Sequence, residues 1–403
     1  MTSYTRAEIA TRSGVSAAQI ERLVELGVLQ PTNSHFTAGD ARRASTAHML
    51  ELAGIPLEVL SAALADGSFS LAFLDHEMYS RLPTYVGRTF AQVSAGTGIP
   101  LALLVALREA IGSPTPSPDD PMREDEMEVV PFIELQVTAG FDPAAIERLL
   151  RVEGDSLRRI AEVEADWYGS QVSHPSMERG EDLTAVGTGE LSTRLETEGT
   201  RALMAILRAH QGRAWGATIL DEAEFTMSRA GLHDPQERHP AMCFLDITGY
   251  TRLTQERGDA AAAELAERLS RLVIRSSLNH GGKAVKWLGD GVMFHFPDPG
   301  LGVAAALQMV AGVAEAGLPP AHVGLHAGSV VFQEGDYFGQ TVNVASRLAE
   351  YARPGEVVVS QAVVNATVEP AALGVAFVEI GPVELKGVSG VMHLYVARPA
   401  APA

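Results

Sequence analysis

The hydrophobic pattern of this chain changes once, near Pro240, and that change constrains the fold more than any other feature. Before it, apolar residues recur every three or four positions, as on one face of a helix, and alternating runs are nearly absent. After it, short apolar runs such as "AMCFLDI" and "EVVVS" alternate with helical stretches. The sequence therefore predicts a multidomain chain, with an all-α N-terminal region followed by an α/β or α+β domain.

The bulk properties agree with a globular protein of several domains. A length of 403 residues exceeds what one hydrophobic core supports, and 46% of the residues are hydrophobic while 20% are charged. The longest uninterrupted apolar run, Ile99 to Leu107, is far shorter than the roughly 20 residues of a membrane helix, and the first residues lack the apolar stretch of a signal peptide. We expect no membrane span and a cytoplasmic location.

Charge and cysteine content narrow the classes of partner and compartment. A formal net charge of −19 argues against broad electrostatic attraction to nucleic acid or anionic lipid, although it allows a local basic patch. The single cysteine, Cys243, cannot form an internal disulfide, and no Cys/His spacing resembles a zinc site. This pattern is typical of a reducing cytosol.

Four segments of the first 150 residues repeat one pattern of helix ending and helix start. In each, a glycine suited to a left-handed helix end is followed by an apolar residue and then by a helix-starting residue. The segments are "SGVSAAQI", "AGIPLEVL", "TGIPLALL" and "AGFDPAAI", with helix starts at Ser16, Pro56, Pro100 and Asp142. We interpret them as helix-turn-helix corners, which favour a helical bundle over DNA recognition.

Two further features divide the N-terminal region. The stretch from Gly112 to Glu128 is rich in Pro and acid and predicts a mobile connection between helical groups. From Leu191 onward, apolar positions such as Leu195, Leu203 and Trp215 predict one long helix that ends near Gly231.

Two acidic residues in the C-terminal domain occupy places suited to cation binding. Asp246 ends the apolar run "AMCFLD", and Gly249 then permits a tight turn into a helix. Asp290 lies in Gly-Asp-Gly between two β-prone runs, a hairpin signal. Two adjacent strands would bring both carboxylates together around hard divalent cations. Taken singly, Asp246 also fits a helix-capping residue and Asp290 a solvated turn.

A helix predicted in "DYFGQTVNVASRLAEYARPGE" places Asn343 and Arg347 four residues apart, hence on one face. Together they have the chemistry to bind a ribose oxygen and a phosphate. An ordinary solvated helix surface is the alternative for this pair in isolation.

The three motifs "FLDITGYT", "KWLGDGVMF" and "DYFGQTVNVASR", in this order and spacing, closely resemble the catalytic domain of class III nucleotidyl cyclases over roughly residues 238 to 398. The resemblance implies an α+β, ferredoxin-like or palm-type catalytic fold. It also implies two Mg²⁺ or Mn²⁺ ions per site, bound by Asp246, Asp290 and the carbonyl of Ile247.

By the same resemblance, Asn343 orients the ribose and Arg347 stabilises the α-phosphate in the transition state. Lys286 and Asp336 match the positions that read adenine. A Lys donor and an Asp acceptor suit adenine, whereas guanine has the opposite polarity at the corresponding atoms, so we expect ATP as the substrate. The loop after Asp246, with Thr248 and Gly249, would bind the triphosphate.

Family members divide these residues between two subunits. This chain carries both sets and is expected to form a head-to-tail homodimer with two sites. One departure concerns the last strand, where many relatives have a phosphate-binding Lys and this chain has Met392. Triphosphate binding then falls to the loop after Asp246, to Lys386 or to another base.

The N-terminal region resembles two kinds of regulatory domain. Its start, "YTRAEIATRSGVSAAQIERLVELGVLQP", is similar to the winged helix-turn-helix of MerR-type regulators, but Glu21, Arg22 and Leu23 stand where such regulators place Arg and Tyr. DNA is therefore disfavoured as a partner. Residues from about 85 to 230 resemble the helical domain ahead of some actinobacterial soluble adenylate cyclases.

The expected organisation is a MerR-like domain at 1–80, a helical regulatory domain at 81–190, a transducer helix with linker at 191–237 and the catalytic domain at 238–403. His233 and His239 in the loop "LHDPQERHP" allow a pH-switch hypothesis, with ordinary solvated histidines as the alternative. The apolar helices suggest a small-molecule or lipid effector. A transcription regulator with a nucleotide-binding, catalytically silent cyclase-like domain is the rival function.

Overall fold

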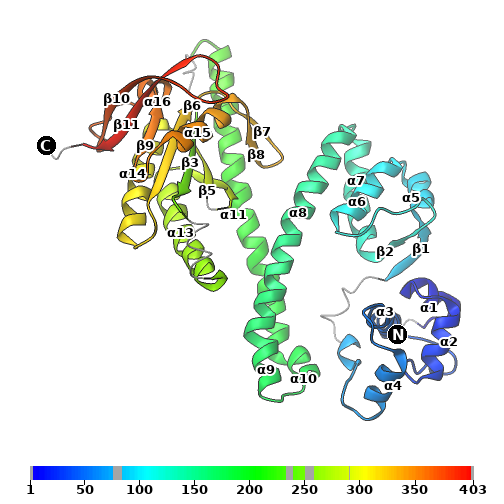
Figure 1. Cartoon of the computed structure of the whole chain (residues 1–403). Coiled ribbons are helices and arrows are strands. Elements are labelled where there is room, and N and C mark those ends of the chain that lie inside the picture. The colour runs from blue at the N-terminus through cyan, green and yellow to red at the C-terminus, as the bar shows by residue number, and fades with distance from the viewer. Residues whose placement is uncertain (1–2, 76–83, 233–238, 250–257, 290, 401–403) are drawn as a thin grey trace. The chain divides into compact units, whose positions relative to one another are not determined.

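The computed structural model describes residues 3–75, 84–232, 239–249, 258–289 and 291–400. The chain divides into two units, Met1–Asp221 and Glu222–Ala403 (Figure 1). Within the described ranges, no helix combines the length and the apolar character needed to cross a membrane.

The first unit begins with four helices around a core of their own. These are α1 (Arg6–Ser13), α2 (Ala17–Glu25), α3 (Ala38–Leu52) and α4 (Leu57–Ala65), followed by the 3₁₀ turn η1 (Ala72–Asp75). Ile9, Ile20, Leu23 and Leu57 are almost completely buried in it. Burial of such side chains from every helix is what holds helices this short in place.

A second helical group has a separate core. It comprises β1 (Tyr85–Thr89), α5 (Phe90–Thr97), α6 (Leu101–Ala110), β2 (Pro121–Arg123), α7 (Glu124–Thr138) and α8 (Pro143–Tyr168). Phe90, Leu104 and Ile133 lie at its centre. The predicted helical N-terminal region is confirmed, and the structure adds one small two-stranded antiparallel sheet, β1 with β2.

All four predicted helix-turn-helix corners are present. They join α1 to α2, α3 to α4, α5 to α6 and α7 to α8. The corner glycine has a positive φ in every case, as a left-handed helix end requires: Gly14 at 69°, Gly54 at 93°, Gly98 at 74° and Gly140 at 79°.

The prediction of a mobile connection from Gly112 to Glu128 is wrong for its second half. β2 and the start of α7 occupy Pro121 to Glu128. The acid run there is a helix N-terminus, where carboxylates are favourable, and Glu126 is completely buried against Arg108. The acidic residues of this stretch therefore belong to a helix start and a buried ion pair rather than to a linker.

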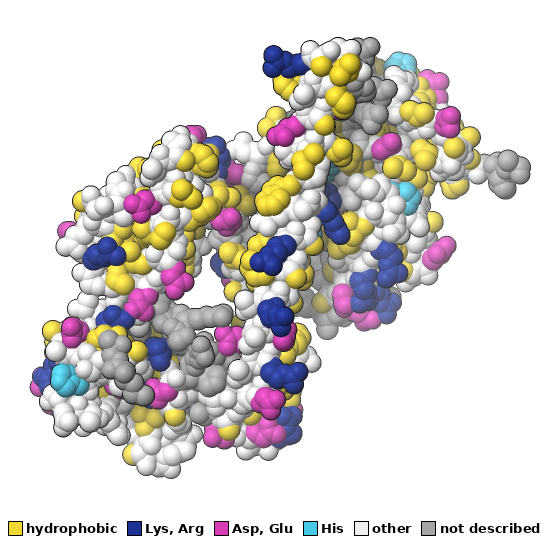
Figure 2. Space-filling model, turned by 180° about the vertical axis from the view of Figure 1, so that it is seen from behind, with side chains coloured by type: hydrophobic (Ala, Val, Ile, Leu, Met, Phe, Trp, Pro, Cys, Tyr) yellow, Lys and Arg dark blue, Asp and Glu magenta, His cyan; other side chains and the backbone are white. Residues whose placement is uncertain are grey.

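The rest of the first unit is helical, and its last helix runs into the second unit. A π-helical turn (Gly169–Ser173), α9 (His174–Glu178) and α10 (Leu183–Thr188) precede α11 (Glu190–Arg229). With 40 residues, α11 agrees with the long helix that the sequence predicts. Hydrophobic side chains on α11 are exposed to solvent, among them Leu207, Trp215 and Phe225 (Figure 2).

The second unit is built on one seven-stranded sheet with the order β10-β11-β9-β6-β3-β5-β4. Its strands are β3 (Ala241–Ile247), β4 (Lys283–Leu288), β5 (Gly291–Phe296), β6 (Ala321–Ala327), β9 (Val357–Ser360), β10 (Val375–Glu384) and β11 (Val391–Pro399). β6 and β9 are parallel, and the other neighbours are antiparallel. A small hairpin, β7 (Val331–Gln333) with β8 (Asp336–Phe338), stands outside the sheet.

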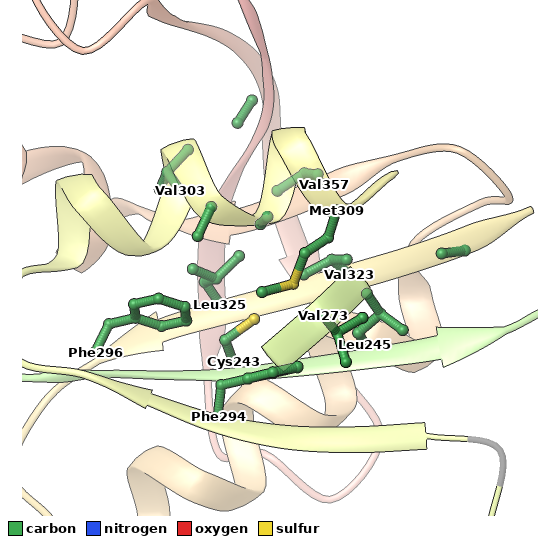
Figure 3. Packing of buried hydrophobic residues seen from close by; sticks show 14 of the residues in the cluster. Cys243, Leu245, Val273, Phe294, Phe296, Val303, Met309, Val323, Leu325 and Val357 are labelled. Carbon is green, nitrogen blue, oxygen red and sulfur yellow. The ribbon is translucent and has the colours of Figure 1, made fainter. Parts of the chain in front are cut away.

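Helices cover both faces of β3. On one face, Cys243, Leu245 and Ile247 pack with residues of α13 (Asp259–Asn279) and α14 (Pro299–Glu315), where Met309 of α14 meets them (Figure 3). The alternate residues, Met242 and Phe244, face α15 (Gln340–Tyr351). A short helix, α16 (Gln361–Ala366), completes the unit.

The position of α15 depends on one close approach to the sheet. A Cβ atom at Gly324 of β6 would lie 2.1 Å from the backbone N of Ala349 and 2.6 Å from the carbonyl O of Ala345. Only glycine leaves room for the helix backbone at this point. Gly324 therefore sets the distance between α15 and the strands that carry the candidate active site.

Candidate active site

Asp246 lies on the sheet face that α15 covers, one residue before β3 ends. Its Oδ1 accepts a hydrogen bond from the backbone N–H of Ile247 at 3.0 Å, and its Oδ2 lies 3.5 Å from Nε2 of His322. The side chain is 45% exposed, so the carboxylate is open to a ligand. A half-exposed carboxylate beside the carbonyl of Ile247 supplies the oxygen donors that Mg²⁺ and Mn²⁺ prefer.

The β4–β5 hairpin ends beside Asp246, as the sequence predicts. Leu288 pairs with Gly291 across the turn, and Gly289 has a φ of 69°. A Cβ atom at Gly291 would lie 3.1 Å from the carbonyl O of Leu245 and 3.5 Å from Oδ1 of Asp246. Asp290 itself lies outside the described residues, so its place in a metal site remains a prediction.

Within the described ranges, no cluster of three or more His, Cys, Asp or Glu side chains forms a metal site. The donor chemistry of Asp246 and Ile247 nevertheless fits a divalent cation, because both offer hard oxygen ligands at the exposed end of one strand.

Lys286 and Asp336 lie together although they are far apart in the sequence. Nζ of Lys286 on β4 forms an ion pair with Oδ2 of Asp336 at the start of β8. Their side chains are 40% and 24% exposed, so solvent reaches the pair. Oδ1 of Asp336 accepts from the backbone N–H of Tyr337 at 2.8 Å, which fixes the direction of the carboxylate. A donor and an acceptor are thus placed side by side at one partly open point.

Aromatic contacts that the sequence did not single out hold the β7–β8 hairpin against the sheet. The ring of Tyr337 stacks on His295 of β5, with centroids 4.4 Å apart and planes inclined by 10°. Nζ of Lys283 lies 5.3 Å from the Tyr337 centroid and 5.4 Å from that of Phe332. Burial, and then the nearby charge of Lys283, lower the pKa of His295 to about 4.

Asn343 and Arg347 project from the exposed face of α15. The opposite face, with Val344, Ala345 and Leu348, is buried against the unit. Nη1 of Arg347 lies 2.6 Å from both carboxylate oxygens of Glu350, and the Arg347 side chain is 41% exposed. The predicted geometry of these two residues is confirmed, and the guanidinium remains accessible to a further ligand.

The loop after Asp246 begins with a firmly placed Thr248. Its backbone N–H donates to the carbonyl of Pro320 at 2.9 Å, and its Oγ1 lies 3.2 Å from Nδ1 of His322. Gly249 has a φ of 77°, a left-handed conformation that favours glycine. His322 was missed in the sequence, since only the pairing of β3 with β6 brings it opposite Asp246.

Met392, at the position where many relatives have a phosphate-binding Lys, lies in an apolar cluster. It packs against the apolar cluster of Val344, Leu348 and Leu394 between α15 and the sheet. Lys386 is exposed in the turn between β10 and β11. The structure thus gives a packing reason for Met392 and leaves Lys386 as a candidate cation for the triphosphate.

Comparisons with known proteins found one matching family and several relatives. Residues 235–398 match the family described as the adenylate and guanylate cyclase catalytic domain. A relative from Mycobacterium tuberculosis, named pH-sensitive adenylate cyclase MT1302, is 28% identical over 78% of this chain and 78% of its own length. An adenylate cyclase from Streptomyces griseus is 31% identical over 56% of this chain and 55% of its own length.

Among solved structures, the adenylyl cyclase CyaB from P. aeruginosa aligns with 42% of this chain and 98% of its own, with 21% sequence identity and a TM-score of 0.36.

Proposed function

The chain belongs to the class III adenylate and guanylate cyclase family through its C-terminal domain, and from this we propose that it converts ATP to 3′,5′-cyclic AMP and pyrophosphate. The observation that carries the choice of substrate is the meeting of Lys286 and Asp336 in the folded domain. The other proposed site residues are Asp246, Asn343, Arg347 and Asp290, the last of which lies outside the described residues.

Adenine fits the Lys286–Asp336 pair by its polarity. Lys286 donates to N1 of the base, and Asp336 accepts from the 6-amino group. Guanine has an N–H at N1 and a carbonyl oxygen at position 6. Its N–H would face the Lys286 donor, and its carbonyl would face the Asp336 acceptor. Because both side chains are partly exposed, the base can replace each partner of the ion pair without opening a buried core.

The reaction is intramolecular and needs no covalent enzyme intermediate. The ribose 3′-oxygen bonds to the α-phosphorus, the bond from that phosphorus to the bridging oxygen breaks and pyrophosphate leaves, while the proton of the 3′-hydroxyl passes to solvent water. When bound, divalent cations supply Lewis-acid activation and neutralise charge on the polyphosphate. Asp246, Asp290 and the carbonyl of Ile247 would hold these two Mg²⁺ or Mn²⁺ ions.

The remaining residues orient the substrate and stabilise the developing charge. Asn343 would hold the ribose, and Arg347 would meet the negative charge that grows on the α-phosphate during attack. Thr248 and Gly249 would present backbone and hydroxyl donors to the triphosphate. Before substrate arrives, Nη1 of Arg347 donates to both carboxylate oxygens of Glu350, one turn further along α15.

A head-to-tail homodimer would complete two such sites, with Asp246 and Asp290 from one copy and the other four residues from its partner. The exposed apolar side chains of the β7–β8 hairpin, Val331, Phe332 and Phe338, support an interface close to Asp336. Exposed Trp215 and Phe225 on α11 support pairing of the long helices.

The N-terminal helical region would regulate this activity, with α11 as the transducer.

An open groove of about 610 Å³ lies between α6, α7 and α8 and supports an apolar effector there. Its lining includes Leu107, Val129, Leu150 and Leu157. Among the described residues that line the groove, the acids are Glu153 and Glu162, and burial raises the pKa of Glu153. His233 lies outside the described residues, whereas His239 lies within them and is partly buried, and a pH switch at these two histidines stays a prediction. We place the reaction in the cytoplasm, in keeping with the single, buried Cys243.

The rival function is a transcription regulator with a silent nucleotide-binding domain, and α1 with α2 is the feature in its favour. The charges on α2 oppose it. Arg22 is paired with Glu58 at 2.6 Å, and Glu21 with Arg6 at 3.2 Å. A helix whose arginine is already neutralised attracts phosphate weakly.

The test is cyclic AMP formation from Mn-ATP by the full chain, beside Asp246→Asn, Asp290→Ala and, as a control away from the site, Glu379→Gln. Product from the wild type and the control, lost in both aspartate variants, is expected. Silence of the wild type, together with salt-sensitive binding to a defined DNA duplex, would favour the regulator instead.

A further inference from the structure

His322 contacts two residues of the candidate site although no sequence motif includes it. It lies on β6 directly opposite Asp246 on β3 in antiparallel register, and paired residues of neighbouring strands project from the same face. Its Nε2 lies 3.5 Å from Oδ2 of Asp246, and its Nδ1 lies 3.2 Å from Oγ1 of Thr248. One imidazole therefore bridges the end of the strand and the start of the loop.

The His322 imidazole is more deeply buried than the Asp246 carboxylate that it faces. Its side chain is 14% exposed, against 45% for Asp246. One residue beyond the paired segment, the hydrogen bond from Thr248 N–H to the carbonyl of Pro320 continues the pairing of β3 with β6. His322 therefore stands behind the carboxylate, on the sheet, while the carboxylate itself reaches solvent.

Both oxygens of Asp246 are thereby restrained. Oδ1 accepts from the backbone N–H of Ile247, and Oδ2 faces His322. With its proton on Nε2, the imidazole presents an N–H toward Asp246 and an acceptor at Nδ1 toward the hydroxyl of Thr248. Groups that hold a ligating carboxylate in this way fix its orientation before the metal arrives.

We propose that His322 is a positioning residue, which orients the Asp246 carboxylate toward a divalent cation and the Thr248 hydroxyl toward the triphosphate. The inference rests on the proposed function, because that function assigns cation binding to Asp246. His322 acts through Asp246 and Thr248 and touches neither substrate nor the reacting atoms.

The test measures Mn²⁺ binding directly, without turnover. The full chain is titrated with Mn²⁺ in the presence of 3′-deoxy-ATP, which lacks the attacking hydroxyl, and free Mn²⁺ is followed by electron paramagnetic resonance. His322→Ala is expected to weaken Mn²⁺ binding by about tenfold, within the range for partners of a metal ligand. His322→Gln is expected to recover part of the affinity, since its amide N–H can donate toward Asp246.

A matched control is available on the same strand. His326 lies on the same face of β6, four residues on, and its Nδ1 lies 2.7 Å from Oγ of Ser360 rather than near Asp246. His326→Gln also removes an imidazole from β6, and we expect wild-type Mn²⁺ affinity in that variant. In turnover, the Mn²⁺ concentration for half-maximal rate is expected to rise about tenfold for His322→Ala alone.

Unchanged Mn²⁺ affinity in a folded His322→Ala variant would overturn the proposal. Thermal unfolding checks the fold, and if the alanine variant is unfolded, His322→Asn decides, because its shorter amide cannot reach Asp246. Asp246→Asn separates the two levels of inference. If Asp246→Asn leaves Mn²⁺ binding intact, the proposed metal site is rejected. If Asp246→Asn loses Mn²⁺ binding while His322→Ala keeps it, only the positioning role of His322 is rejected.

Discussion

Lys286 and Asp336 form an ion pair across 50 residues of sequence, between a strand of the main sheet and the small β7–β8 hairpin. Tyr337, next to Asp336, stacks on His295 and so holds the hairpin at the sheet. Under the proposed function, the preference for adenine over guanine would therefore depend on how the hairpin docks on the sheet.

Asp336→Ala removes the acceptor expected for the 6-amino group of adenine. A binding site loses much of its transition-state stabilisation when one partner of a specific hydrogen bond is missing. We therefore expect kcat/KM for ATP to fall by about 100-fold. Steady-state rates with ATP and GTP measure this, with Glu379→Ala on exposed β10 as the control. An unchanged preference for ATP would reject the role of Asp336 as a base reader.

Arg347→Ala is expected to lower kcat by about 100-fold or more, with a smaller effect on the KM for ATP, because the guanidinium acts on charge that develops during attack. Arg353→Ala, which removes an exposed arginine just beyond the same helix, is the matched control. A variant whose KM rises while kcat is retained would instead assign Arg347 to ground-state binding.

Gly324→Ala should destabilise the catalytic unit, because the added Cβ would overlap the backbone of α15 at Ala349. We expect a loss of about 1–3 kcal/mol in the free energy of unfolding, measured by urea denaturation. Gly212 on α11 has open space around its Cβ position, and Gly212→Ala is expected to have no such cost. Equal stability of both variants would contradict the close approach.

The buried pair of Arg108 and Glu126 makes a prediction about the helical region. Nη2 of Arg108 lies 2.7 Å from Glu126 Oε2, and the guanidinium lies 4.7 Å from the Phe90 ring. Glu126→Ala leaves a buried charge unpaired and is expected to cost about 3–5 kcal/mol. The double variant Arg108→Met with Glu126→Met should recover most of that loss in thermal unfolding. A double variant as unstable as the single one would assign the cost to packing.

Two histidines on the sheet make stability depend on pH. Burial lowers the pKa of His326 to about 4, and burial with the charge of Lys283 does the same for His295. The unfolded chain binds protons at these sites near the ordinary value of 6.5, so stability falls as pH decreases from about 6.5 to about 4 and then levels off.

Urea midpoints at pH 7, 6 and 5 test this point, with wild type compared with His295→Phe and His326→Gln. In each of these two variants, the urea midpoint should fall less between pH 7 and pH 5 than in the wild type. In His393→Gln, at an exposed position of β11, it should fall as much as in the wild type. Identical declines in all four proteins would show that other groups are responsible.

Much of the site follows from local sequence. Gly-Asp-Gly specified the β4–β5 turn, and helical spacing placed Asn343 and Arg347 on one face, because both patterns depend on residues close in the chain. The same is true of the four glycine corners. The acid run at Glu124–Glu128 was misread, since composition alone does not distinguish a linker from a helix N-terminus whose Glu126 pairs with a distant arginine.

By itself, then, the sequence determined the two-part organisation, the helix corners and the chemical identity of the candidate residues, all of which follow from periodicity and turn chemistry. Only the tertiary structure decided that Lys286 meets Asp336, that Met392 packs under α15 and that His322 stands behind Asp246. These contacts depend on which strands become neighbours, and strand order is set by packing of the whole domain rather than by any local segment.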